Sequence, residues 1–194
     1  MRDATSCSCA VDDRRIPLFV LDNAVRRLVQ PPRRFLGRHL RPGDSVADLG
    51  CGPGHFTLPM TRLVGDGGRV IAVDFDPSAI ERLRRKAARR GAGEVVQAHV
   101  ASAAEIDFIE TGSLDFVLAE GLLCCMTDHA GAVRQIARIL RPAGRAWLSV
   151  MKHAPAGDPR SVTAGEWASI LGGMRVLRSG AGLFTRWALV SPRP

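Results

Sequence analysis

The hydrophobic and polar positions along the chain follow two different periods. Short apolar runs typical of buried strands alternate with stretches in which apolar residues recur every three or four positions, as on one face of a helix. The predicted strands span residues 45–50, 69–75, 94–100, 114–120, 145–151, 174–179 and 186–191. The predicted helices span residues 18–30, 33–40, 54–64, 77–91, 129–140 and 163–171.

This alternation predicts an α/β fold. Strands separated by helical segments run parallel, with helices on both faces of their sheet. Only "GAGLFT" separates the last two predicted strands, so they should form a hairpin, with one strand antiparallel to the rest. We therefore expect a three-layer sandwich around a seven-stranded, mostly parallel sheet. Residues 1–15 read as a disordered tail, and 16–194 as a single domain that begins with a short helical lid (16–41).

Composition narrows the class of protein. The chain is 46% hydrophobic, and no run approaches the roughly 18 apolar residues of a membrane span, so we expect a soluble globular protein without one. The polar N-terminus lacks the apolar core of a secretory signal, which predicts a cytoplasmic protein. The five cysteines include an adjacent pair, Cys124 and Cys125, and form no C-x-x-C motif. This pattern predicts reduced thiols and no metal site.

The net charge of +8 leaves two interpretations open. Twenty-five of the 27 basic residues are arginine, and they are scattered in local pairs. They can form an ordinary solvated surface, or they can attract an anionic partner such as nucleic acid. No aromatic residues alternate with the basic pairs, as they do in grooves that bind single strands.

The stretch "VADLGCGPGHFT" (46–57) places a glycine-rich turn between the first main strand and the next helix. Such a turn lets backbone approach a ligand closely and presents unpaired N–H groups at the helix start. The dinucleotide fingerprint G-x-G-x-x-G fits at Gly50 and Gly52, but His55 occupies the third glycine position. A nicotinamide-dependent oxidoreductase is therefore disfavoured but not excluded.

The pattern D-x-G-x-G-x-G from Asp48 to Gly54 resembles motif I of the class I S-adenosylmethionine (SAM)-dependent methyltransferases. Asp74 ends the second strand 24 residues after Gly50. The segments "GSLDFVLAEGLL" and "ARILRPAGRAWLSV" are similar to the family's fourth strand and to its helix, turn and fifth strand. The resemblance runs from about residue 43 to 190. It implies a Rossmann-like methyltransferase fold of the small-molecule type, with SAM as cofactor and S-adenosylhomocysteine as product.

The resemblance also implies a set of cofactor-binding residues. They are Asp48, Gly50, Cys51, Gly52, Gly54, Asp74, Phe75, Ser102, Ala103 and Glu120. The glycines would approach the methionyl and ribose portions, and Asp48 would orient the turn and the ammonium group. Asp74 would accept hydrogen bonds from both ribose hydroxyls, and Phe75 would lie against the adenine. The backbone carbonyl of Glu120 would meet the ammonium group.

One position departs from the family's pattern. Many relatives have an aspartate after the third strand that accepts the adenine amino group, and Ser102 stands at that place here. The backbone N–H of Ala103 can still serve the adenine ring. Because a neutral hydrogen-bond acceptor is weaker than a charged one, we expect a lower affinity for the cofactor.

Methyl transfer is an in-line displacement that requires alignment more than fixed catalytic groups. The acceptor site is expected at residues 119–128 and 151–156, which contain neither an N/D-P-P-Y/F motif nor a Pro-Cys pair. Catalytic residues stay unassigned, with His129, Cys125 and Glu120 as weak candidates. Cys124 and Cys125 can line the acceptor pocket or bind a soft substrate, or they can be small buried hydrophobes.

The sequence is compatible with three alternative functions. The first is a SAM-dependent methyltransferase for a small organic or lipid-like acceptor, which the apolar "LLCCM" segment favours. The second is a methyltransferase for RNA or protein. The third is a non-catalytic SAM-binding subunit that serves a partner chain. The sequence leaves the oligomeric state open.

Overall fold

The computed structural model describes residues 13–15, 17, 32–152 and 158–193. The predicted helix at 18–30 lies outside these ranges, as does most of the predicted tail. The helices are α3 (Pro32–Leu36), α4 (Thr57–Val64), α5 (Pro77–Ala88), η1 (Leu123–Cys125, a 3₁₀ turn), α6 (His129–Ile139) and α7 (Ala164–Gly172). The strands are β1 (Ser45–Leu49), β2 (Arg69–Asp74), β3 (Val96–Val100), β4 (Leu114–Glu120), β5 (Leu140–Met151), β6 (Arg175–Ala181) and β7 (Thr185–Ser191).

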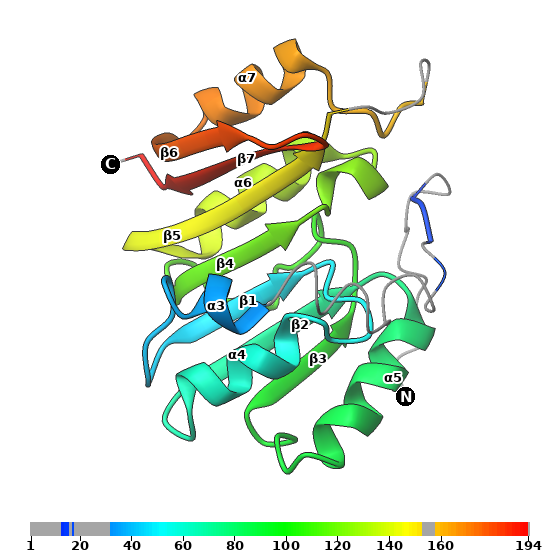
Figure 1. The fold of residues 1–194 in the computed structure, drawn as a ribbon, viewed down its shortest axis with the longest axis vertical. Coiled ribbons are helices and arrows are strands. Elements are labelled where there is room, and N and C mark those ends of the chain that lie inside the picture. Colours follow the sequence, from blue (N-terminus) through cyan, green and yellow to red (C-terminus); the bar gives the residue numbers. More distant parts are fainter. Residues whose placement is uncertain (1–12, 16, 18–31, 153–157, 194) are drawn as a thin grey trace.

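The seven strands form a single sheet in the order β3-β2-β1-β4-β5-β7-β6 (Figure 1). The five strands from β3 to β5 are parallel, and β7 is antiparallel to both β5 and β6. The predicted mixed sheet and its closing hairpin are therefore confirmed. Because the chain winds from β1 to one edge and returns to β4 on the other side, a topological switch point lies between β1 and β4.

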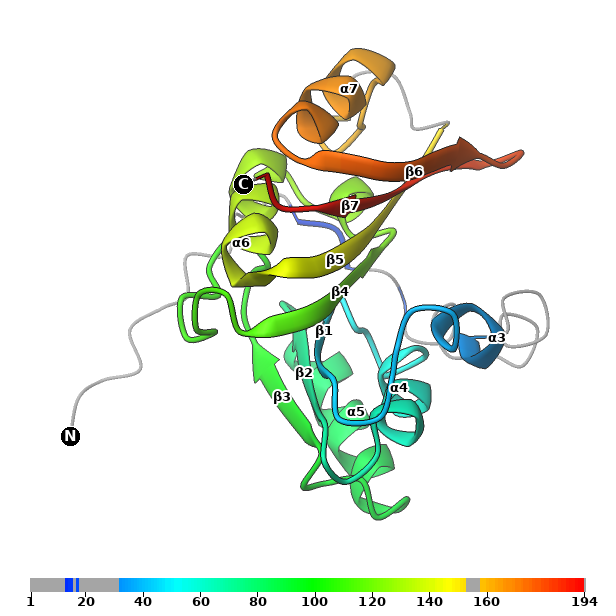
Figure 2. The ribbon, with the colours of Figure 1, turned by 90° about the vertical axis from the view of Figure 1, so that its left-hand side faces the viewer.

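Helices cover both faces of this sheet. Figure 2 shows α3, α4 and α5 on one face, and α6 and α7 on the other. Successive strand residues point to opposite faces. In β1, Val46 packs with Leu36 and Met60 on the first face, whereas Ala47 packs in the cluster that includes Ile136 on the second. The central strands are therefore buried on both sides, as a parallel sheet requires.

Some element boundaries differ from the predicted ones for local reasons. α4 begins at Thr57 and not at residue 54, because Gly54 has a φ of +90°, which a right-handed helix cannot contain. β5 begins at Leu140, five residues before the predicted 145, and Leu140 pairs with Leu114 ahead of a bulge. Extended backbone is favoured there because Arg141 precedes a proline.

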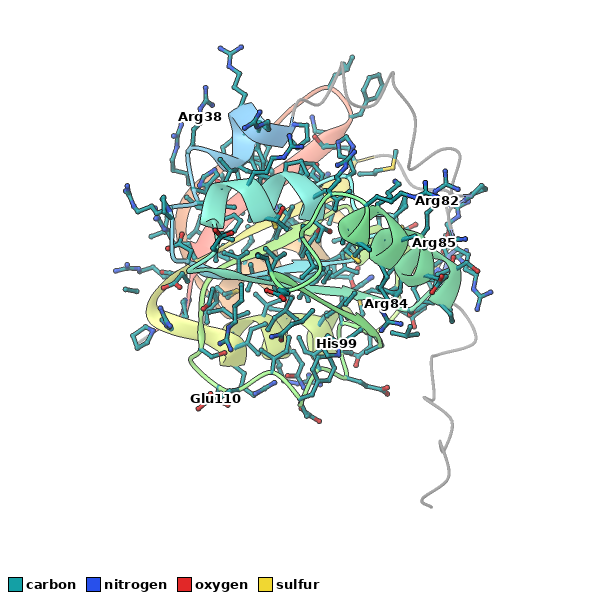
Figure 3. The ribbon with its side chains drawn as sticks, turned by 90° about the horizontal axis from the view of Figure 1, so that it is seen from below. Arg38, Arg82, Arg84, Arg85, His99 and Glu110 are labelled. Atoms are coloured by element: carbon teal, nitrogen blue, oxygen red, sulfur yellow. The ribbon has the colours of Figure 1, made fainter. Side chains whose placement is uncertain are left out.

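The arginines of α5 lie on its exposed outer side. Figure 3 shows Arg82, Arg84 and Arg85 together on this helix. Arg84 donates a hydrogen bond to the carbonyl of Ala98 at 2.6 Å, and Arg85 pairs with Glu81 at 3.5 Å. These contacts fit a solvated surface, and the alternative of an anionic partner stays a prediction.

Within the described ranges, no helix has the length and apolar character needed to cross a membrane. In the same residues, no three or more His, Cys, Asp or Glu side chains gather in a way that would hold a metal ion.

Candidate cofactor and acceptor site

A cavity of about 440 Å³ opens at the carboxyl ends of the central strands, beside the switch point. Its volume lies within the roughly 300–1,000 Å³ of small-molecule sites. The predicted cofactor residues that line this cavity are Asp48, Gly50, Cys51, Gly52, Asp74, Phe75, Ser102, Ala103 and Glu120. Gly54 is the predicted cofactor residue that does not line it. The fold thus brings together residues from four separate segments of the chain.

The glycine turn is fixed against the neighbouring strand. Gly50 and Gly52 have φ angles of +74° and +52°, in the left-handed region that favours glycine. The N–H groups of Gly50 and Cys51 both donate to the carbonyl of Val73, at 2.8 and 3.0 Å. A Cβ on Gly50 would lie 3.1 Å from the side chain of Leu122, so glycine keeps the turn close to the opposite wall.

Gly54 serves helix packing. A Cβ at this position would lie 2.5 Å from Cδ1 of Leu83 in α5. The residue therefore permits the turn before α4 to approach α5 closely. The third glycine of a dinucleotide fingerprint, one position later in the sequence, also permits close packing, but between helix and strand.

The carboxylate of Asp74 is positioned by two backbone amides. Gly52 donates to Oδ2 at 2.7 Å, and Asp76 donates to Oδ1 at 2.9 Å. Burial raises the pKa of Asp74, while the two amide hydrogen bonds act in the opposite direction. A carboxylate has about four acceptor positions, so two remain for a ligand's hydroxyl groups.

Asp48 is joined to the first residue of α4. It is 3% exposed, and its Oδ2 accepts a hydrogen bond from the hydroxyl of Thr57 at 2.6 Å. This bond fixes the end of the glycine turn to the start of the helix. Thr57 was not predicted as a site residue, although it is the last residue of the stretch 46–57.

The described part of the N-terminal segment lies on the cavity wall, formed there by Asp13, Arg14, Arg15 and Pro17. The N–H of Arg14 donates to the carbonyl of Cys125 at 2.8 Å, and Oδ1 of Asp13 accepts from the N–H of Thr127 at 3.1 Å. The Arg15 guanidinium lies 6.0 Å from the centre of the Phe75 ring. No sequence signal indicated these contacts, because the predicted tail (1–15) is polar and aperiodic.

The predicted lid is only partly described. Its helix α3 packs beside α4, with Leu36 fully buried in the shared core. Arg33 and Arg34 on this helix are exposed and are not part of the cavity wall.

Ser102 and Ala103 line the cavity just after β3. The Ser102 hydroxyl accepts a hydrogen bond from the N–H of Ala104 at 3.3 Å. The N–H of Ala101 donates to the Asp74 carbonyl at 3.1 Å, which ties this loop to the end of β2. The loop therefore lies beside Asp74 at the end of β2.

Glu120 ends β4 with its side chain held in place. Its Oε2 accepts a hydrogen bond from the indole N–H of Trp147 at 2.8 Å. The N–H of Gly121 is shared between the carbonyl and the hydroxyl of Ser149, at 3.2 and 3.0 Å. These bonds fix the ends of β4 and β5 relative to each other. No sequence signal indicated the role of Trp147.

Cys124 and Cys125 lie on η1 and line the cavity with Met126 and Met151. The Cys124 thiol is 3.1 Å from the carbonyl of Gly121. A hydrogen bond from Cys125 lowers the pKa of Cys124 to about 6, and the same bond raises the pKa of Cys125. Of the two predicted alternatives, pocket lining or buried core, the structure supports pocket lining for both cysteines.

Cys51 differs from this pair. Burial, together with the nearby carboxylate of Asp48, raises its pKa well above the usual value. It is therefore a protonated, unreactive thiol at neutral pH.

The histidines occupy different places. His129 begins α6, is 5% exposed, and has its Nδ1 2.5 Å from Oε1 of Glu166 in α7. It links two helices and is not part of the cavity wall, whereas His55 is. His153 lies outside the described residues. Of the weak catalytic candidates, the structure brings Cys125 and Glu120 to the cavity.

The residues present fit SAM. Five acidic residues and two arginines line the cavity, so the acidic wall complements the ammonium and sulfonium charges of the cofactor. The glycine turn allows close approach to its backbone, and the partly buried Asp74 has acceptor capacity left. Fold and cavity together define the class: a Rossmann-like α/β protein with the SAM-dependent methyltransferase fold.

Comparison with known proteins identifies the family. The family model described as a methyltransferase domain matches residues 47–148, which is more than half of the chain. The chain belongs to this family of SAM-dependent methyltransferases. The match begins at the strand before the glycine turn and ends in β5, so it includes every predicted cofactor residue.

Similar proteins include methyltransferases for small molecules. Nocamycin O-methyltransferase of Saccharothrix syringae is 34% identical over 136 residues, which cover 70% of this chain and 45% of that protein. The solved structure of a SAM-dependent methyltransferase from Aquifex aeolicus has a TM-score of 0.76 at 20% identity and covers 89% of this chain and 95% of its own.

A third match is the 1,6-didemethyltoxoflavin-N1-methyltransferase of Burkholderia thailandensis, solved with 1,6-didemethyltoxoflavin and S-adenosylhomocysteine bound. It has a TM-score of 0.68 at 25% identity and covers 90% of this chain and 81% of its own. The chain spans about half the length, or less, of the first curated relatives that it matches.

Proposed function

We propose that this chain transfers the methyl group of SAM to a small organic acceptor. The observation that carries the proposal is the cavity at the switch point. Its wall unites the glycine turn with a partly buried Asp74 held by two backbone amides. The small-molecule methyltransferases among the relatives support the same conclusion.

Different residues of the cavity wall bind different parts of the cofactor. Asp74 accepts hydrogen bonds from the ribose hydroxyls, and Phe75 lies against the adenine with Arg15 above its ring. Ser102 and the N–H of Ala103 serve the adenine edge. The turn at Gly50–Gly52, with Asp48 behind it, receives the methionyl portion, and the end of β4 at Glu120 meets the ammonium group.

When bound, SAM supplies an electrophilic methyl group on sulfur. The chain's own part is to align the acceptor with that methyl and to exclude water. Met126 and Met151 give the acceptor end an apolar wall, and the contacts of Asp13 and Arg14 with residues 125–127 hold the N-terminal segment there. This partly apolar end favours a compact organic acceptor over RNA or protein.

The test is a thermal-melt comparison of the protein alone, with SAM, with S-adenosylhomocysteine and with NAD. Ligand at one hundred times its Kd stabilises a protein by about 2.7 kcal/mol. For a chain of this size that corresponds to a shift on the order of 5–10 °C. We expect shifts with SAM and its product that disappear in Asp74→Ala, and a shift with NAD alone would overturn the proposal.

Transfer itself is tested with SAM labelled in the methyl group. Label should pass to small organic hydroxyl or amine compounds in an acceptor screen. Label on RNA or protein would favour the second function. Cofactor binding with no label transferred to any acceptor would favour the non-catalytic subunit.

A further inference from the structure

Cys124 and Cys125 are a pair of adjacent free thiols on the wall of the cavity. Both side chains are partly exposed, so a ligand in the cavity can reach them. They line the same cavity as Met126 and Met151. Neither the cofactor roles proposed above nor alignment of a methyl acceptor explains why two thiols should stand here together.

The backbone holds the pair in place. The N–H of Cys125 donates to the carbonyl of Leu122 at 2.9 Å, which closes the 3₁₀ turn. The carbonyl of Cys125 accepts the N–H of Arg14 at 2.8 Å, and the Cys124 thiol bonds to the carbonyl of Gly121 at 3.1 Å. The two sulfur atoms are therefore presented by a turn that is anchored at both ends.

The thiols are suited to bind an external group in preference to each other. Adjacent Cα atoms lie about 3.8 Å apart, below the roughly 4.4–6.8 Å of ordinary disulfides, so closure of the pair into a disulfide is disfavoured. The lowered pKa of Cys124, about 6, favours loss of its thiol proton when an electrophile enters the cavity. Two adjacent cysteine sulfurs are a soft donor pair.

The two sulfur donors of Cys124 and Cys125 determine which class of ligand the pair can bind. In the described residues no third His, Cys, Asp or Glu completes a metal-binding group with these thiols. A trivalent arsenical with one carbon substituent needs two thiols and no more. We propose that Cys124 and Cys125 form a dithiol site that binds such a thiophilic organoarsenical at the acceptor end of the cavity.

The binding reaction balances without any oxidant or reductant. With phenylarsine oxide, two As–S bonds form and the bonds from arsenic to its oxygen break. Arsenic stays trivalent, and the two thiol protons leave with that oxygen as one molecule of water. The proposal goes beyond methyl transfer, since binding can be measured without any turnover.

The experiment titrates the full chain with phenylarsine oxide and follows the adduct by intact-protein mass spectrometry. We expect one equivalent to bind, to resist a wash with 2-mercaptoethanol, and to be released by 1,2-ethanedithiol. Joining two binding groups raises affinity by about 10²–10⁴-fold, so Cys124→Ser and Cys125→Ser should each weaken binding by that factor. Retention of full affinity in either variant would overturn the proposal.

The chain offers a matched control in Cys7 and Cys9, its other closely spaced cysteines. The double variant C7S/C9S should keep the adduct, and loss of the adduct in it would contradict the assignment. Alkylation with iodoacetamide, followed by peptide mapping, needs no variant at all. Phenylarsine oxide should protect the peptide that contains Cys124 and Cys125, and unprotected thiols there would also refute the site.

Discussion

The backbone N–H of Gly52 donates a 2.7 Å hydrogen bond to Oδ2 of Asp74. This bond joins the glycine turn after β1 to the acid that ends β2. It explains why the two features occur together, because the turn that approaches a ligand also positions the carboxylate that would bind it. Asp76 completes the arrangement from the start of α5.

Replacement of Asp74 by asparagine should weaken binding of S-adenosylhomocysteine. Hydrogen bonds to a charged group contribute about 1.5–3 kcal/mol each, so the loss of charge should lower affinity by roughly 10–100-fold. Isothermal titration calorimetry measures the Kd of S-adenosylhomocysteine for each variant. Asp66→Asn on an exposed turn is the matched control and should bind normally. Equal affinity in both variants would remove Asp74 from the cofactor site.

Binding of S-adenosylhomocysteine should also depend on pH through Asp74. Because burial raises the pKa of this carboxyl, its charged, accepting form is lost at a higher pH than in an ordinary aspartate. Affinity should be full above the raised pKa and should fall as the pH drops through it. Asp74→Asn should lack this dependence, and an identical pH profile in both proteins would assign the titration to another group.

Thr57→Val should destabilise the fold. The substitution keeps the shape but removes the 2.6 Å hydrogen bond to buried Asp48, at a cost of about 1–3 kcal/mol. Urea unfolding measures the change in free energy. Thr57→Ser retains the hydroxyl and should recover most of the stability. If the valine variant were as stable as the wild-type protein, the hydrogen bond to Asp48 would contribute nothing to the fold.

Gly54→Ala should destabilise the protein by about 1–3 kcal/mol through overpacking, with added strain from its positive φ. The new methyl would lie 2.5 Å from the Leu83 side chain. Gly93→Ala is the control, since a Cβ there meets no atom within 4 Å. Thermal unfolding of the two variants should differ clearly, and equal melting temperatures would contradict the close packing of the turn against α5.

Cys124 should react with iodoacetamide at unusually low pH. Its pKa of about 6 places half of the thiol in the reactive form near that pH, whereas an ordinary cysteine reaches this point near about 8.5. Peptide mapping after alkylation at a series of pH values gives the profile. In Cys125→Ser the thiol hydrogen bond is replaced by one from a hydroxyl, so the profile should stay low. In Cys125→Ala the profile should move toward the ordinary value.

Sequence alone determined the sheet and the centre of the site. Strand and helix periods are local properties, so β1, β2 and β4 could be located from a few neighbouring residues each. The carboxyl ends of parallel strands meet at one edge, which is why Asp48, Asp74 and Glu120 could be expected together. The glycine turn was recognisable because its spacing is fixed within seven residues.

Tertiary structure decided the contacts between distant segments. Asp13 meets the N–H of Thr127 across 114 positions, and Trp147 reaches Glu120 across 27. His129 pairs with Glu166 and does not line the cavity, and Gly54 packs against Leu83. No periodic pattern encodes such pairs, because they depend on how whole helices and loops pack, and on which side chain then fills the space between them.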